Sequence, residues 1–208
     1  MSHREKLKGL YVITDDSLTP SNTLFSQVKQ AIEGGAKIVQ LRDKKSSDKV
    51  ILQTALKLQE LCRSYNLLFV LNDKVELAIQ HKFDGLHIGK SDHGRFEEIR
   101  ANFKGVLGVS CYGDIAKAQE FETLGADYVA FGSFYSSPTK PDSNIVPLET
   151  LKIAKNRLTI PICAIGGIHS ENLSEVLENR ADMVAVISDI WKSEDIKQKC
   201  EIYKQQLD

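Results

Sequence analysis

Short runs of apolar, β-prone residues recur along the chain and alternate with segments of helical spacing. Eight such runs are present, and in each the apolar residues are continuous rather than alternating with polar ones. Continuous runs are typical of parallel strands that are buried on both faces of a sheet. The expected strands are residues 10–14, 38–41, 68–71, 85–88, 106–110, 128–131, 162–165 and 183–187.

The intervening segments carry the helical pattern, as in residues 50–61, where Ile51, Ala55 and Leu58 fall on one face. Eight strand–helix units predict an α/β fold, the (β/α)8 TIM barrel. No linker or break in composition interrupts the alternation, so we expect residues 1–208 to form one compact domain. The expected helices are residues 24–32, 50–61, 75–79, 96–103, 115–124, 148–154, 173–177 and 196–203.

Similar short sequence motifs recur where an expected helix ends and the next expected strand begins. The residues of these motifs lie at the N-terminal face of such a barrel. They include Asp84, Asp127 and Asp182, which we therefore interpret as turn or capping residues. In this fold the chemistry lies at the opposite face, where the strands end. Polar residues that follow strand ends are thus the candidates for function.

Composition narrows the function classes. The chain has 208 residues, a net charge of −1 and 42% hydrophobic residues, which argues against disorder. Near-neutral charge also argues against a general nucleic-acid or anionic-membrane binder, because those carry a strong basic excess. The net charge does not exclude a small anionic ligand that is bound by a few local cations.

The cysteines Cys62, Cys111, Cys163 and Cys200 form no Cys-x-x-Cys motif, so no zinc or redox motif is visible. We expect reduced thiols in a cytoplasmic protein. The apolar stretch near the N-terminus is too short for a signal peptide, and no apolar stretch is long enough to span a bilayer.

Cationic residues follow the second and sixth expected strands. Period-2 alternation puts Gln40 and Arg42 on one face of their strand, which points both into the barrel mouth. An arginine grips phosphate bidentately, while lysines such as Lys44 and Lys140 act as point charges. Several cations in one place repel one another unless an anion neutralises them, so the pattern predicts an anionic ligand.

Two carboxylates, Asp73 and Asp92, follow neighbouring strands and can reach one Mg²⁺, which typically takes one or two carboxylates plus phosphate oxygens and water. Cations beside such a site suggest a pyrophosphate. The alternatives are that Asp73 and Asp92 cap the helices that follow them. Arg42 could likewise pair with Asp43 or Asp73 in a structural network.

A second phosphate site is suggested after the last two strands, the usual phosphate-binding position in such barrels. Gly166 and Gly167 let backbone approach a ligand closely, and Ile187-Ser188 offers an N–H and a hydroxyl. Paired glycines also serve plain turns. His87, within a strand, we interpret as a satisfied structural histidine because no nearby pattern gives it a partner.

Six sequence blocks together resemble the thiamine-phosphate synthase family, in the family's order and over nearly the whole chain. They are YVITD (11–15), VQLRDK (39–44), LND (71–73), DGLHIGKSD (84–92), GADYV (125–129) with PTKPD (138–142), and AIGGI (164–168).

The resemblance implies a transferase that joins 4-amino-2-methyl-5-(diphosphooxymethyl)pyrimidine to a thiazole phosphate, plain or carboxylated, with Mg²⁺ as cofactor. The products are thiamine monophosphate and pyrophosphate. It implies catalytic roles for Arg42, Lys44, Ser110 and Lys140, and metal ligation by Asp73 and Asp92. The implied pyrimidine diphosphate contacts are Gln40, Leu41, Arg42, Asp43, Lys44, Asn72, Ser110 and Lys140. The implied thiazole phosphate contacts are Ser137, Pro138, Thr139, Gly167, Ile187 and Ser188.

The chain departs from the family pattern at two relevant places. Ser136-Ser137 stands where the family usually has Pro-Thr, and Asp189 adds a negative charge beside the expected phosphate. Two rival functions are a related barrel that isomerises the thiazole phosphate and a non-catalytic barrel that binds it. The isomerase has no need for one combination of residues that is present here, namely Arg42, Lys44, Asn72, Asp73, Asp92 and Lys140. Small phosphorylated molecules are the expected partners, and the oligomeric state is left open.

Overall fold

The strands close into a barrel in which each pairs in parallel with the next and the last pairs with the first. This computed structural model describes residues 3–136 and 144–208. The predicted (β/α)8 barrel is confirmed. The strands are β1 (Gly9–Ile13), β2 (Ile38–Leu41), β3 (Leu68–Asn72), β4 (Gly85–Ile88), β5 (Val106–Tyr112), β6 (Tyr128–Phe131), β7 (Ile162–Ile165) and β8 (Met183–Val186).

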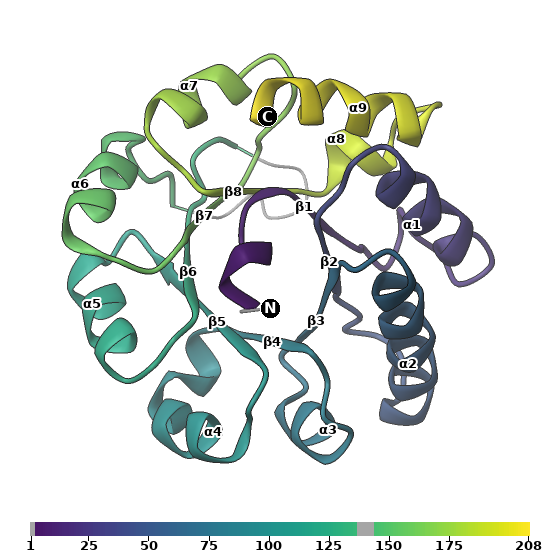
Figure 1. Cartoon of the computed structure of the whole chain (residues 1–208), viewed down its shortest axis with the longest axis horizontal. Coiled ribbons are helices and arrows are strands. Elements are labelled where there is room, and N and C mark those ends of the chain that lie inside the picture. The colour runs from purple at the N-terminus through teal and green to yellow at the C-terminus, as the bar shows by residue number, and fades with distance from the viewer. Residues whose placement is uncertain (1–2, 137–143) are drawn as a thin grey trace.

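Helices surround the barrel as an outer ring (Figure 1). No helix among the described residues is long and apolar enough to cross a membrane. The α-helices are α1 (Leu24–Glu33), α2 (Asp48–Ser64), α3 (Val75–Gln80), α4 (Phe96–Asn102), α5 (Ile115–Thr123), α6 (Glu149–Arg157), α7 (Leu173–Glu178), α8 (Ser188–Trp191) and α9 (Ile196–Leu207). Two 3-10 helices, η1 (His3–Lys6) and η2 (Lys90–Arg95), complete the fold.

Apolar side chains pack in two layers. The larger cluster lies between the outer faces of the strands and the helices, and includes Leu41, Leu58 and Phe121. The smaller one fills the barrel interior, where Ile38, Leu68 and Val106 meet from different strands. Strands buried on both faces explain the continuous apolar runs in the sequence.

The N-terminal end of the barrel interior is filled by the start of the chain. Figure 1 shows η1 inside the ring of strands. Leu7, which follows it, is buried and packs with the interior cluster. An open cavity therefore has room only toward the other end, where the strands finish.

Asp127 and Asp182, at the N-terminal face, have structural roles, although through side-chain links between elements rather than as the predicted turn or capping residues. Asp127 accepts hydrogen bonds from the Arg100 guanidinium at 2.9 Å and from the backbone N–H of Leu107 at 2.8 Å. Asp182 accepts in the same way from Lys155 and from the backbone N–H of Ile162. Each carboxylate thus joins the start of one strand to the neighbouring strand and to an outer helix.

Candidate active site

A cavity of about 350 Å³ opens where the strands end. All eight strands or the residues directly after them contribute to its wall. Of the residues singled out from the sequence, Gln40, Arg42, Lys44, Asn72, Asp73, Ser110 and Ile187 line it. The cavity therefore lies at the face where such barrels carry their functional sites, which is the face expected from the sequence pattern.

Three cationic residues line the cavity, Arg42, Lys44 and Lys90, and neighbours fix the backbone of the first two. The Thr14 hydroxyl accepts from the backbone N–H of Arg42 at 2.9 Å and donates to its carbonyl at 3.3 Å. The N–H of Lys44 donates to Asp16 at 3.3 Å. Neither Arg42 nor Lys44 forms an ion pair with another described residue. Both charges therefore remain available to an anion, and the structural pairing considered for Arg42 is not found in this part of the chain.

A chain of hydrogen bonds forms the cavity floor. The Gln40 side-chain amide donates to the Tyr11 hydroxyl at 2.6 Å, and the Tyr11 and Tyr128 hydroxyls lie 3.0 Å apart. The Tyr128 hydroxyl is 2.9 Å from His87 Nδ1, and His87 Nε2 is 2.9 Å from Ser110 Oγ. Burial raises the pKa of both tyrosines, so their hydroxyls stay neutral at physiological pH.

Gly108 makes room for this floor. A Cβ at this position would overlap the ring and hydroxyl of Tyr128. The missing side chain on β5 lets the tyrosine of the next strand lie across the barrel interior, where its hydroxyl meets Tyr11 and His87. A glycine inside a strand often marks such a close approach.

Of the two carboxylates predicted to hold a metal, Asp73 lines the cavity, whereas Asp92 follows the lining residues Lys90 and Ser91 and does not line it. Asp73 lines it in a left-handed backbone conformation, φ 61°, and its carboxylate faces Gly89, just before η2. Asp92 lies on η2 and accepts from the Ser91 hydroxyl at 2.8 Å. Neither carboxylate caps α3 or α4, which disfavours the capping alternative.

The two carboxylates could bind Mg²⁺ only if a bound substrate supplied further oxygen ligands. Within residues 3–136 and 144–208, no group of three or more His, Cys, Asp or Glu side chains could hold a metal. Magnesium binds through one or two carboxylates and completes its octahedron with phosphate oxygens and water. Asp73, beside the cations Arg42 and Lys44, fits that pattern because a bound diphosphate would supply the remaining oxygens.

A second hollow adjoins the first. It is lined by Gly167 and Ser188, whereas the preceding residues Gly166 and Ile187 line the first cavity. Consecutive residues after β7 and after β8 thus border the two hollows. Gly167 has φ 65°, and a Cβ there would meet the carbonyl oxygen of Ser136 at 2.5 Å, so glycine is required.

Other predicted contacts lie elsewhere. The Leu41 side chain is buried between barrel and helices, and the Asp43 carboxylate accepts from the backbone N–H groups of Lys45 and Ser46. Substrate contacts by these two residues stay predictions. Four further predicted residues lie outside the described ones, namely Ser137, Pro138, Thr139 and Lys140.

Sequence reasoning missed Tyr11 and Tyr128 because an aromatic residue in a strand is normally core. His87 is satisfied, as predicted, but it has partners 23 and 41 residues away that no local pattern reveals. The alternation of side chains along a strand could have indicated Tyr11, because it points to the same face of β1 as Ile13 at the end of the strand.

Comparisons with known proteins agree with the geometry. The family model for thiamine monophosphate synthase matches residues 10–190. Thiamine-phosphate synthase from Wolinella succinogenes is 43% identical over 190 residues, covering 89% of this chain and 86% of that protein. The enzyme from Nitrosococcus oceani is 38% identical over 200 residues, covering 96% and 92%.

Comparison with solved structures indicates the same family. Thiamine phosphate pyrophosphorylase from Pyrococcus furiosus superimposes with a TM-score of 0.86 at 35% identity, covering 98% of this chain and 96% of that one. A geranylgeranylglyceryl phosphate synthase from Thermoplasma acidophilum, at 13% identity and a TM-score of 0.73, shares the fold alone. Sequence, fold and relatives together show that this chain is an enzyme of the thiamine monophosphate synthase family.

Proposed function

We propose that the protein joins the pyrimidine diphosphate to the thiazole phosphate and releases thiamine monophosphate and pyrophosphate. The observation that carries this proposal is the pair of adjoining hollows, one lined by three cationic residues and the other bordered by Gly167 and Ser188. Because consecutive residues border the two hollows, two phosphorylated substrates bound one in each would have their reactive ends close together.

The first cavity would bind the pyrimidine diphosphate. Arg42 and Lys44 would contact its phosphates, because neither charge is neutralised by another described residue. The neutral hydroxyls and amide of the floor would hydrogen-bond the aminopyrimidine ring. The full proposed set is Gln40, Leu41, Arg42, Asp43, Lys44, Asn72, Ser110 and Lys140.

The thiazole phosphate would occupy the second hollow with its phosphate on the backbone of Gly167 and on Ser188. Ile187, which borders the first cavity, would lie beside the place where the two substrates meet. The remaining proposed contacts are Ser137, Pro138 and Thr139. Both the plain and the carboxylated thiazole phosphate are candidates, and the carboxylated form would also lose CO2 on its way to thiamine monophosphate.

In the reaction, the bond between the pyrimidine methylene carbon and the diphosphate oxygen breaks, and its electron pair leaves with pyrophosphate. The thiazole nitrogen lone pair then forms the new carbon–nitrogen bond. An electron-rich aminopyrimidine stabilises the cation formed between these steps, so no side-chain nucleophile is needed. Arg42, Lys44, Ser110 and Lys140 would stabilise the charge that develops on the leaving group.

Asp73 and Asp92 would hold Mg²⁺ together with diphosphate oxygens. When bound, the metal would neutralise part of the leaving group's negative charge. Apolar cavity walls such as Ile13, Ile165 and Ala130 would keep water from the cation, since water would trap it. We further propose that the enzyme acts in the cytoplasm on small molecules, without nucleic acid or membrane.

Pyrophosphate release tests this function. The protein would be incubated with both substrates and Mg²⁺, and with each substrate alone, while pyrophosphate and thiamine monophosphate are quantified. We expect equal amounts of both products, and only when both substrates are present. Isomerisation of the thiazole phosphate alone, or binding of both substrates without any pyrophosphate, would favour one of the two rival functions.

A further inference from the structure

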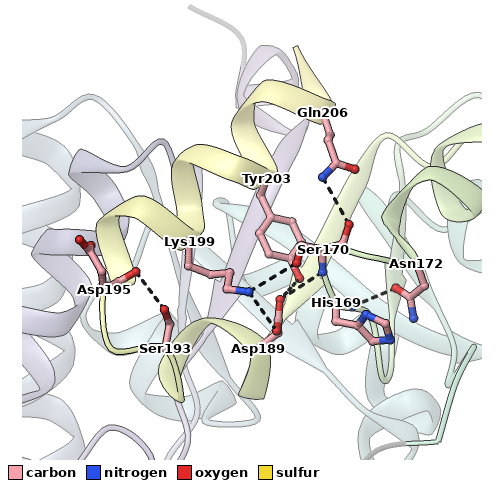
Figure 2. Close-up of polar contacts among 9 residues, drawn as sticks. All are labelled: His169, Ser170, Asn172, Asp189, Ser193, Asp195, Lys199, Tyr203 and Gln206. Carbon is pink, nitrogen blue, oxygen red and sulfur yellow. Dashed lines mark hydrogen bonds and ion pairs between the residues drawn. The ribbon is translucent and has the colours of Figure 1, made fainter.

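Asp189 lies directly beside the second hollow, where its negative charge should disfavour a phosphate. It is the second residue of α8 and follows Ser188, which the proposed function assigns to the thiazole phosphate. The structure shows how this charge is accommodated. The Asp189 side chain lies against α9, in contact with three groups from elsewhere in the chain (Figure 2).

Asp189 joins two segments that are distant in sequence. Its Oδ2 accepts from the Tyr203 hydroxyl at 2.7 Å and from the backbone N–H of Ser170 at 3.1 Å. Its Oδ1 lies 3.5 Å from Lys199 Nζ, which is also 3.4 Å from the Ser170 hydroxyl. Ser170 belongs to the loop after β7, and the other two partners belong to α9, as Figure 2 shows.

The surroundings make these contacts strong. Tyr203 is fully buried, and Asp189 and Lys199 are each 23% exposed, so water competes only partly for them. Burial and the neighbouring carboxylate raise the pKa of Tyr203, which keeps its hydroxyl a donor at neutral pH. Lys199 balances the Asp189 charge, which reduces repulsion of a nearby phosphate.

The loop that Asp189 holds is the one that carries Gly167. Asn172 accepts from the N–H of His169 at 2.9 Å and donates to the Gly167 carbonyl at 3.2 Å. Gln206 of α9 donates to the Ser170 carbonyl at 3.3 Å. The loop is therefore braced from within by Asn172 and from α9 by Asp189 and Gln206.

We propose that Asp189 is a positioning residue for the thiazole phosphate: it ties the loop after β7 to α8 and α9, and so holds Gly167 and Ser188 in the arrangement that binds the phosphate. This rests on the proposed function. Asp189 lines the second hollow with Ser170 and Lys199, but its oxygens are engaged by Ser170, Lys199 and Tyr203, so we assign it to holding the loop rather than to binding the phosphate.

Steady-state kinetics of D189A, D189N and Y203F test the proposal, with E201Q on the exposed face of α9 as matched control. For D189A we expect KM for the thiazole phosphate to rise about tenfold, the effect of losing one or two hydrogen bonds, with KM for the pyrimidine diphosphate unchanged. D189N should recover most of the affinity, because an amide oxygen still accepts from Ser170 and Tyr203. E201Q should match wild type.

Y203F keeps the proposal testable if D189A fails to fold, because it removes only one hydroxyl. We expect a rise of about threefold in the same KM, a fraction of one hydrogen bond's contribution. A lower KM for the thiazole phosphate in D189A or D189N would show that Asp189 acts by repulsion and would overturn the proposal. Loss of thermal stability with both KM values unchanged, or an equal rise in both, would overturn it as well.

A binding measurement separates this proposal from the proposed function. Trp191 on α8 is the chain's single tryptophan, and its Nε1 donates to the carbonyl of Ile13. Its fluorescence would report binding of 4-methyl-5-(2-phosphooxyethyl)thiazole without turnover. Weaker binding by D189A supports positioning even if the wild type forms no product. Unchanged binding with an active wild type overturns positioning alone, and no binding to wild type overturns both.

Discussion

Arg42 shows how individual residues prepare the cavity. Its backbone is held on both sides by the Thr14 hydroxyl, while its side chain lines the cavity without an ion pair among the described residues. Thr14 has no recognisable role in the sequence, because its partner is 28 residues away. Strand parity, in contrast, predicted correctly that Gln40 and Arg42 face the cavity together.

Removing the Arg42 charge should impair turnover. We expect Arg42→Ala to lower kcat/KM by about 10²–10³, as when one preorganised charge-stabilising donor is lost. Lys45→Ala is the matched control, since Lys45 is exposed and does not line the cavity. Equal activity of the two variants in the pyrophosphate release assay would remove Arg42 from the proposed site.

Cys111 adjoins Ser110 but should not act as a nucleophile. It is 1% exposed, and burial raises the pKa of its thiol to about 12, so it is protonated at neutral pH. The thiolate is the reactive form, so Cys111→Ser and Cys111→Ala should both keep activity within about twofold. Inactivity of both variants with unchanged melting temperature would contradict this assignment.

At the scale of elements, the sequence predicted every strand of the barrel but missed the short helix α8. Strands β2, β4, β6 and β7 have the predicted bounds. Strand β5 continues two residues further than predicted, because a bulge between Ser110 and Tyr112 lets it pair again with β6. The helix α8 has four residues, too few to show a helical period, so the element beside the second hollow was not predicted.

The links between elements at the N-terminal face should stabilise the fold rather than the reaction. Asp127→Ala removes the acceptor of the Leu107 N–H and one acceptor of the Arg100 guanidinium, which should cost about 1–3 kcal/mol in the free energy of unfolding. Glu120→Ala, which breaks an exposed pair with Lys117, should change it by less than about 0.5 kcal/mol. Denaturant titration measures both. Loss of kcat in Asp127→Ala without loss of stability would be the opposite result.

The carboxylates at the ends of β3 and on η2 should confer the metal requirement. We expect EDTA to abolish activity and added Mg²⁺ to restore it, with Asp73→Asn and Asp92→Asn each needing more Mg²⁺ for half-maximal rate. Asp114→Asn is a suitable control, because Asp114 caps α5 away from the cavity. Full wild-type activity in EDTA would rule out the proposed metal role.

At the scale of the whole molecule, the net charge of −1 and the binding of anions are compatible. The protein gathers a few cations at one end of a barrel whose other end is filled by Leu7, so no basic surface is needed. The order of parallel strands predicted which residues meet at that end. The sequence alone could not predict the floor of the cavity, because Tyr11, Tyr128 and His87 meet only when the barrel closes.

The central claim is that two adjoining hollows bind the two halves of one reaction. A crystal structure with thiamine monophosphate, pyrophosphate and Mg²⁺ tests it most directly. We predict pyrophosphate on Arg42 and Lys44 with the metal on Asp73 and Asp92, and the monophosphate at Gly167 and Ser188. Both phosphate groups in one hollow, or pyrophosphate bound away from Arg42, would contradict the account.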